Sequence, residues 1–330
     1  MKSLRALFAA ASLIALSAGG TVAAEPKVVT SIKPVHALVA AVMEGVGEPG
    51  LILQGAGSPH TYSLRPSQAR MLAAADLVFW VGPNLEAFLA KPVSSLAGEA
   101  KLVTLAEAEG LTLLEPREGG AFEAHLHDEG EEDDGHEDGG HEGGGHDEAG
   151  HEGHDHHGAD AHIWLDPQNA RLMARAVAEA LSKVDPENAA AYAANMARLE
   201  KRIDGLETEI TADLASVKDR PFIVFHDAYQ YFEKRFGLAA AGSITVSPEV
   251  IPGAQRVDEI RTKVQELDAA CVFSEPQFEP RLIEVVTEGT NARSGVLDPL
   301  GAELTDGPDL YFDLIRGMAA SLKDCLSAAR

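Results

Sequence analysis

Short apolar runs alternate with stretches of helical periodicity along most of the chain. In the first half, four of these runs are expected to form strands, at residues 28–31, 51–53, 77–81 and 101–104. In the second half, four more are expected at residues 222–225, 239–244, 270–274 and 295–297. Strands separated by helices pair in parallel, and a parallel sheet needs cover on both faces. The pattern therefore predicts an α/β protein of two lobes, each with a four-stranded, mostly parallel sheet flanked by helices.

A single long helix is expected between the two halves. From Tyr192 to Val217, apolar residues recur at intervals of three and four, which places them on one helical face. A helix over residues 186–217 would be roughly 46 Å long, enough to run along both lobes. A coiled-coil dimer is the alternative, but so short a stripe in a compact chain favours packing within one monomer. We therefore expect lobes at residues 25–185 and 218–330, joined by a rigid helix.

Residues 121–160 interrupt the first lobe with a segment of low complexity. They include 15 acidic residues, ten glycines and nine of the 13 histidines, and they contain no lysine or arginine. Such a composition cannot bury a core, so we expect a mobile loop. Several metal ions could bind it weakly, since ordering the loop costs entropy. A solvated acidic spacer is the alternative interpretation. The candidate ligands are His125, His127, His136, His141, His146, His151, His154, His156 and His157.

The charge balance disfavours polyanionic partners. The chain has 27 basic and 52 acidic side chains, and its formal net charge is −25. A surface this acidic cannot neutralise phosphates, so nucleic acids and anionic membranes are poor partners.

The first 24 residues are typical of a secretory signal peptide. Lys2 and Arg5 precede an apolar run at 7–16, and small residues end at Ala24. The run is shorter than the roughly 20 residues that cross a bilayer, which disfavours a membrane anchor. We expect cleavage near Ala24 and export of a soluble protein.

Two cysteines, Cys271 and Cys325, follow the signal sequence. In an oxidising compartment they most simply form one disulfide bond. A redox-active or metal-binding pair is the alternative, but the two residues lack the close spacing of such pairs.

Four histidines lie outside the low-complexity segment. His36 falls in a helix-forming stretch and is expected to be structural. His60, His162 and His226 are expected near strand ends, and Asp298 follows another strand. Three imidazoles and a carboxylate would suit Zn²⁺, although their separations match no compact metal motif.

Six segments carry a resemblance to a known family. They are HTYSLRPS (60–67), ADLVFWVGP (75–83), HIWLDP (162–167), FHDAY (225–229), FSEPQF (273–278) and LDPLG (297–301). In this order they resemble the periplasmic zinc-binding receptors of ABC importers, the ZnuA group. The resemblance covers essentially the whole mature chain. It implies two lobes joined by a rigid helix, with a metal in the cleft between them.

The resemblance also implies a ligand set and a role. His60, His162 and His226 match the three imidazole ligands, and the histidine at 226 favours zinc over manganese or iron. Asp298 matches a carboxylate ligand of related receptors, but water is the alternative for this fourth position. Glu275 is a candidate only for supporting the site without binding the metal, or for a structural role. The transported ligand would be Zn(II), and the partner would be the membrane permease of an ABC importer. The low-complexity segment would assist zinc acquisition.

Two other functions remain open at this point. A zinc hydrolase also uses three protein ligands and an open position, but the sequence has no HExxH helix, GxSxG turn or phosphate-binding glycine loop. We therefore expect a protein that is not an enzyme. A periplasmic zinc buffer or adhesin is the second alternative.

Overall fold

The computed structural model describes residues 25–98, 100–117, 122, 158–245, 253–278 and 281–327. The expected signal peptide and the nine histidines of residues 121–160 lie outside these ranges.

Each half of the chain forms a four-stranded sheet in which every strand pair is parallel. The first sheet contains β1 (Val28–Thr30), β2 (Gly50–Leu51), β3 (Leu77–Trp80) and β4 (Lys101–Thr104). The second contains β5 (Phe222–His226), β6 (Gly242–Thr245), β7 (Cys271–Ser274) and β8 (Arg293–Val296). The strand orders are β2-β1-β3-β4 and β6-β5-β7-β8, so the two lobes share one topology. The predicted fold class is confirmed.

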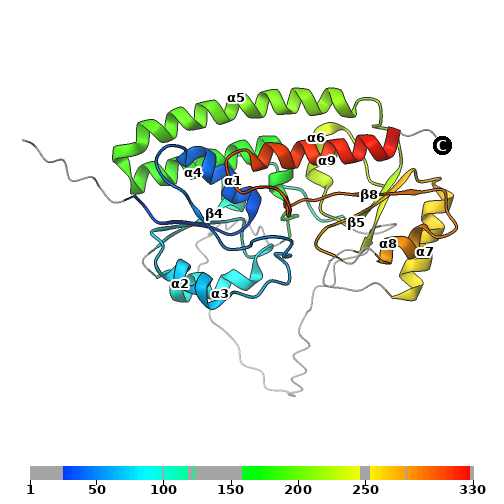
Figure 1. The fold of residues 1–330 in the computed structure, drawn as a ribbon, viewed down its shortest axis with the longest axis horizontal. Helices are drawn as coiled ribbons and strands as arrows, with labels where there is room; N and C mark the ends of the chain where they lie inside the picture. The colour runs from blue at the N-terminus through cyan, green and yellow to red at the C-terminus, as the bar shows by residue number, and fades with distance from the viewer. Residues whose placement is uncertain are drawn as a thin grey trace, which may run out of the picture.

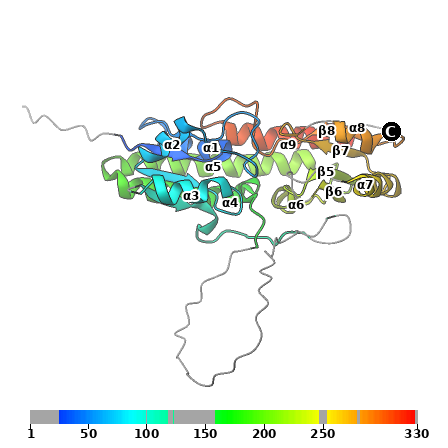
Figure 2. The same cartoon turned by 90° about the horizontal axis from the view of Figure 1, so that it is seen from below.

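The helices cover the sheets and connect the lobes (Figures 1 and 2). In the first half they are α1 (Lys33–Met43), α2 (Pro66–Ala73), α3 (Ala87–Leu96) and α4 (Pro167–Val184). The remainder are α5 (Ala189–Leu214), α6 (Gln230–Phe236), α7 (Ala254–Glu266), α8 (Arg281–Thr287) and α9 (Leu310–Ser327).

Helix starts follow local sequence signals. Pro66 and Pro167 occupy the first positions of α2 and α4, where the missing N–H of proline costs nothing. Asp166 caps α4 by accepting a hydrogen bond from the backbone N–H of Gln168 at 2.8 Å. The long helix is shorter than predicted, because a 3₁₀ turn occupies Pro186–Asn188 and α5 ends at Leu214.

Helix α5 runs along both lobes and contributes to a core that they share (Figure 1). It packs against α1 and α4 of the first lobe and against α9 of the second. Its buried face is mainly apolar and consists of Tyr192, Met196, Leu199, Ile203, Leu206, Ile210 and Leu214, together with the polar Asn195. One continuous apolar cluster includes Phe79 of β3 and Phe273 of β7. Relative motion of domains is restrained where their interface is large and apolar, so this shared core holds the two lobes together.

The predicted disulfide bond is present between Cys271 of β7 and Cys325 of α9. It ties the last helix to the central part of the second sheet. Within the described ranges, no helix has the length and apolar character needed to cross a membrane.

A buried carboxylate stabilises the turn that follows β3. Glu86 is fully buried and accepts hydrogen bonds from the backbone N–H groups of Val81 at 3.2 Å and Gly82 at 2.8 Å. Burial in this apolar surrounding raises the pKa of Glu86 from 4.5 to about 7, because desolvation outweighs these hydrogen bonds.

The raised pKa of Glu86 predicts a pH-dependent stability. The folded protein binds the proton of the Glu86 carboxyl more tightly than the unfolded chain does. The contribution of this proton to the unfolding free energy is therefore full below pH 4.5 and is lost as pH rises through about 7. Relative to Glu86→Gln, the wild type should lose roughly 2–3 kcal/mol of unfolding free energy between about pH 5 and pH 8. Urea unfolding of both proteins across this pH range measures the difference between their unfolding free energies. Groups that titrate alike in both proteins do not contribute to this difference. A difference that stays constant with pH would contradict the assignment.

Candidate metal centre

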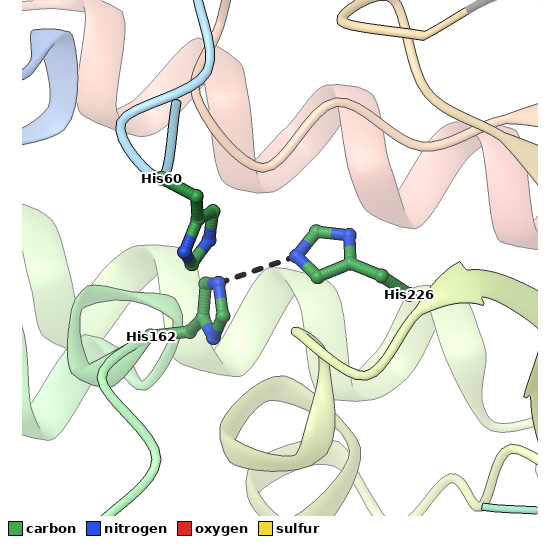
Figure 3. A group of neighbouring side chains, drawn as sticks. All are labelled: His60, His162 and His226. Carbon is green, nitrogen blue, oxygen red and sulfur yellow. Dashed lines mark hydrogen bonds between the residues drawn. The ribbon is translucent and has the colours of Figure 1, made fainter. Parts of the chain in front are cut away.

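Three histidines from three separate segments converge in the structure (Figure 3). His60 lies in the loop after β2, His162 directly precedes the 3₁₀ helix Ile163–Leu165, and His226 is the last residue of β5. The sequence predicted a strand beside His162, and this local detail is wrong. One ligand nitrogen from each ring lies within 4.8 Å of the other two. Among the described residues, these three form the one group of His, Cys, Asp or Glu with such convergence.

The topology of the second sheet explains the position of His226. Strand β5 lies between β6 and β7, so the chain leaves its carboxyl end where the strand order reverses. Side chains at such a point open into a crevice that the connecting loops do not fill. Glu275 follows β7 at the same edge of the sheet, which brings its carboxylate beside His226.

Two carboxylates orient two of the imidazoles. His226 Nδ1 lies 2.6 Å from Glu275 Oε1, and His162 Nδ1 lies 2.8 Å from Asp160 Oδ1. An ionised carboxylate only accepts hydrogen bonds, so each neutral ring donates through Nδ1–H and keeps its lone pair on Nε2. The two Nε2 atoms face each other at 3.3 Å (Figure 3). This arrangement is typical of metal-ligating histidines, whose other nitrogen is held by a carboxylate.

Burial and neighbouring charge act differently on these groups. Burial lowers the pKa of His60 well below 6.5, and the two other imidazoles lower it further. Burial also lowers the pKa of His226, but the adjacent Glu275 raises it more, so the net direction is upward. Burial opposes ionisation of Asp160, yet its contacts with His162 lower its pKa overall. The adjacent Glu275 thus makes His226 a more basic group.

The pocket around the three imidazoles has a largely apolar wall. Trp164, Phe278, Pro299 and Leu300 line it, together with the histidines and Glu275. The Trp164 indole N–H donates to the carbonyl oxygen of Pro299 at 2.8 Å, which joins the segment carrying His162 to the second lobe. An apolar wall excludes water and strengthens the electrostatic attraction between a cation and its ligands.

Asp298 does not join the group of converging ligand atoms. Its carboxylate accepts hydrogen bonds from the backbone N–H groups of Leu300, Gly301 and Ala302, at 3.1, 2.9 and 2.6 Å. The Gln277 amide donates a further one at 3.1 Å. In this conformation the carboxylate stabilises the turn after β8. Its assignment as a fourth ligand stays a prediction.

Asp160 is the site residue that sequence reasoning missed, because it was counted with the low-complexity segment. The available signal was its position two residues before His162. That spacing lets one carboxylate oxygen accept from both the backbone N–H of His162, at 2.9 Å, and its ring. Glu275 was expected to support the site, and its contact with His226 fits that expectation.

The donor set defines what the site can bind. Three imidazole nitrogens suit borderline metal ions such as Zn²⁺ and leave room for a fourth, exchangeable ligand. Metal binding alone accounts for the convergence of the three imidazoles, without a role for a catalytic nucleophile.

The chain is similar in sequence and in fold to known zinc-uptake and zinc-binding proteins. It is 57% identical to the High-affinity zinc uptake system protein ZnuA of Brucella suis, over 99% of this chain and 100% of the relative. The Yersinia pestis protein of the same name is 40% identical, over 92% of each chain. The periplasmic zinc binding protein TroA from Treponema pallidum has a similar fold, with a TM-score of 0.73 at 18% identity, over 92% of this chain and 100% of that one.

These relatives are named as components of uptake systems or as binding proteins, rather than as enzymes. The family model described as zinc-uptake complex component A, periplasmic, matches residues 28–325. The chain therefore belongs to the family of periplasmic A components of zinc-uptake complexes.

Proposed function

We propose that this protein is a periplasmic receptor that binds Zn(II) through His60, His162 and His226 and delivers it to the permease of an ABC importer. The convergence of the three imidazoles within 4.8 Å carries the proposal. The names of the relatives, which are zinc uptake proteins, support zinc as the ligand. The protein acts as a monomer after removal of residues 1–24, and its shared core presents a site already formed between the lobes.

We propose water at the fourth position of this site, in place of Asp298, which the resemblance favoured. Asp298 already accepts four hydrogen bonds, three of them from the backbone of its own turn. Moving its carboxylate to the metal would leave these donors without a partner, at a cost of about 1–3 kcal/mol for each buried one. Asp298 as a direct ligand is the alternative, and it requires this turn to rearrange.

Zinc binding is tested by a competitive titration of the protein lacking residues 123–157, with manganese as the challenger. We expect one tight zinc site that resists manganese and that is lost in His226→Gln. The matched control is His36→Gln, because His36 is also buried but contacts the carbonyl oxygen of Pro49 on another part of the first lobe. A tight site that survives His226→Gln would exclude the three-histidine centre. Absence of any tight site would instead favour a zinc buffer based on residues 121–160.

Removing one orienting carboxylate should weaken the site without abolishing it. Glu275→Gln retains the size of the side chain but removes the charge that holds His226 Nδ1. Such changes next to a metal ligand typically lower metal affinity by roughly 10- to 100-fold. The same titration measures the loss, with Glu86→Gln as a control for replacing a buried carboxylate away from the histidines. Equal affinities for the two variants would contradict a role for Glu275.

We also propose that residues 121–160 collect zinc when it is scarce and pass it to the three-histidine site. The support is the chemistry of the segment, whose nine histidines are His125, His127, His136, His141, His146, His151, His154, His156 and His157. Weak individual sites release an ion readily to a tighter site.

The proposed role of this segment predicts a defect that depends on zinc supply. Cells that carry a deletion of residues 123–157 should take up zinc more slowly at limiting zinc, but normally at ample zinc. A variant with all nine histidines replaced by glutamine keeps the length and acidity of the segment, and it should share the defect. Normal uptake by this second variant would favour the acidic spacer interpretation.

A further inference from the structure

The two chain segments that flank residues 118–157 lie against the second lobe. They are residues 114–117 and 160–162, and both contact α6 or the turn before it. They also pair with each other, because the backbone N–H of Asp160 donates to the carbonyl oxygen of Leu114 at 2.8 Å. The described residues on either side of this stretch therefore form a junction between the lobes.

Arg117 makes the first connection of this junction. Its guanidinium binds Asp227, with Nε 3.0 Å from each carboxylate oxygen and with a further short contact from Nη2. It also binds Glu233, with Nη1 at 2.8 Å and Nη2 at 2.9 Å. Both carboxylates are buried, with side-chain exposures of 3% and 5%. Without this guanidinium, two neighbouring negative charges would lack compensation inside the protein.

Tyr231 and Gln230 make the second connection. The buried Tyr231 hydroxyl donates to the carbonyl oxygen of Asp160 at 2.8 Å and accepts from the backbone N–H of Leu114 at 3.0 Å. The Gln230 side-chain amide donates to Asp160 Oδ2 at 3.0 Å and to the carbonyl oxygen of Glu115 at 2.9 Å. Together these two side chains hold both segments and the carboxylate of Asp160.

Each connection ends next to a histidine of the site. Asp227, which binds Arg117, directly follows His226 in the chain. Asp160, which Gln230 and Tyr231 hold, binds the ring of His162 through its other oxygen, Oδ1, at 2.8 Å. Displacement of the junction would thus move the supports of two imidazoles together.

We propose that Arg117, Gln230 and Tyr231 form a clamp that positions His162 and His226 for the metal. The clamp residues contact no converging ligand nitrogen, so they act through Asp160 and Asp227. The proposal rests on zinc binding by the three histidines. It adds that this junction between the lobes controls how long the ion stays bound, because displaced imidazoles hold the ion less firmly.

The test uses the full-length mature chain and two clamp variants, Arg117→Gln and Tyr231→Phe. Zinc dissociation is followed by transfer to an excess of chelator, and site geometry is followed by the visible absorption of bound Co²⁺. We expect both variants to release zinc roughly tenfold faster, in line with the loss of support around metal ligands, and to alter the Co²⁺ spectrum. Tyr231→Phe removes only one hydroxyl, which limits any effect on folding.

Two matched controls separate positioning from general destabilisation. Tyr192→Phe removes a buried hydroxyl that donates to Asp185 at 2.7 Å, and Arg316→Gln breaks a pair with Glu209 on α5. Both should lower the thermal midpoint without changing zinc release or the Co²⁺ spectrum. Arg117→Lys keeps the charge and should restore part of the retention.

If both clamp variants release zinc as slowly as the wild type and leave the Co²⁺ spectrum unchanged, the clamp is overturned. The proposed function would still stand in that case, provided that the wild type binds zinc tightly. Failure of the wild type itself to bind zinc tightly would instead reject the proposed function.

Discussion

The apolar seam along α5 is the interaction on which the rest of the structure depends. Each sheet could pack its own helices, but α5 buries one continuous face against α1, α4 and α9, and the core cluster runs through both lobes. Separating the lobes would expose this core to water, so the free energy of apolar burial opposes large opening. The distance between the carboxyl edges of the two sheets is consequently set by packing rather than by the ligand.

Packing between the lobes also constrains the relative positions of the three histidines of the proposed metal centre. His60 comes from a loop, whereas His226 comes from a strand end. Asp160 and Glu275 fix the ring orientations of His162 and His226 through hydrogen bonds. Preorganised ligands lose little conformational entropy on binding, which favours tight capture of a scarce ion.

Much of the architecture could be predicted from the sequence because its signals are local. Strand and helix alternation, the proline at position 167 and the apolar stripe from Tyr192 onward each depend on neighbouring residues, and the structure confirms all three. The polar contacts of the site could not be predicted in this way. Arg117 and Asp227 are 110 residues apart, and the turn that engages Asp298 depends on how the chain leaves β8. Such pairs exist only once the lobes have been assembled.

The two carboxylates that orient the imidazoles also determine the net charge of the proposed site. If the three rings bind a metal ion in their neutral forms beside two carboxylates, Asp160 and Glu275, the proposed site would carry a charge of −2 before the ion enters. A divalent cation would bring this sum to zero, whereas a singly charged ion would leave a residual charge that the apolar wall cannot solvate. Charge neutrality in a poorly solvated pocket thus discriminates by valence, independently of ionic size or ligand softness.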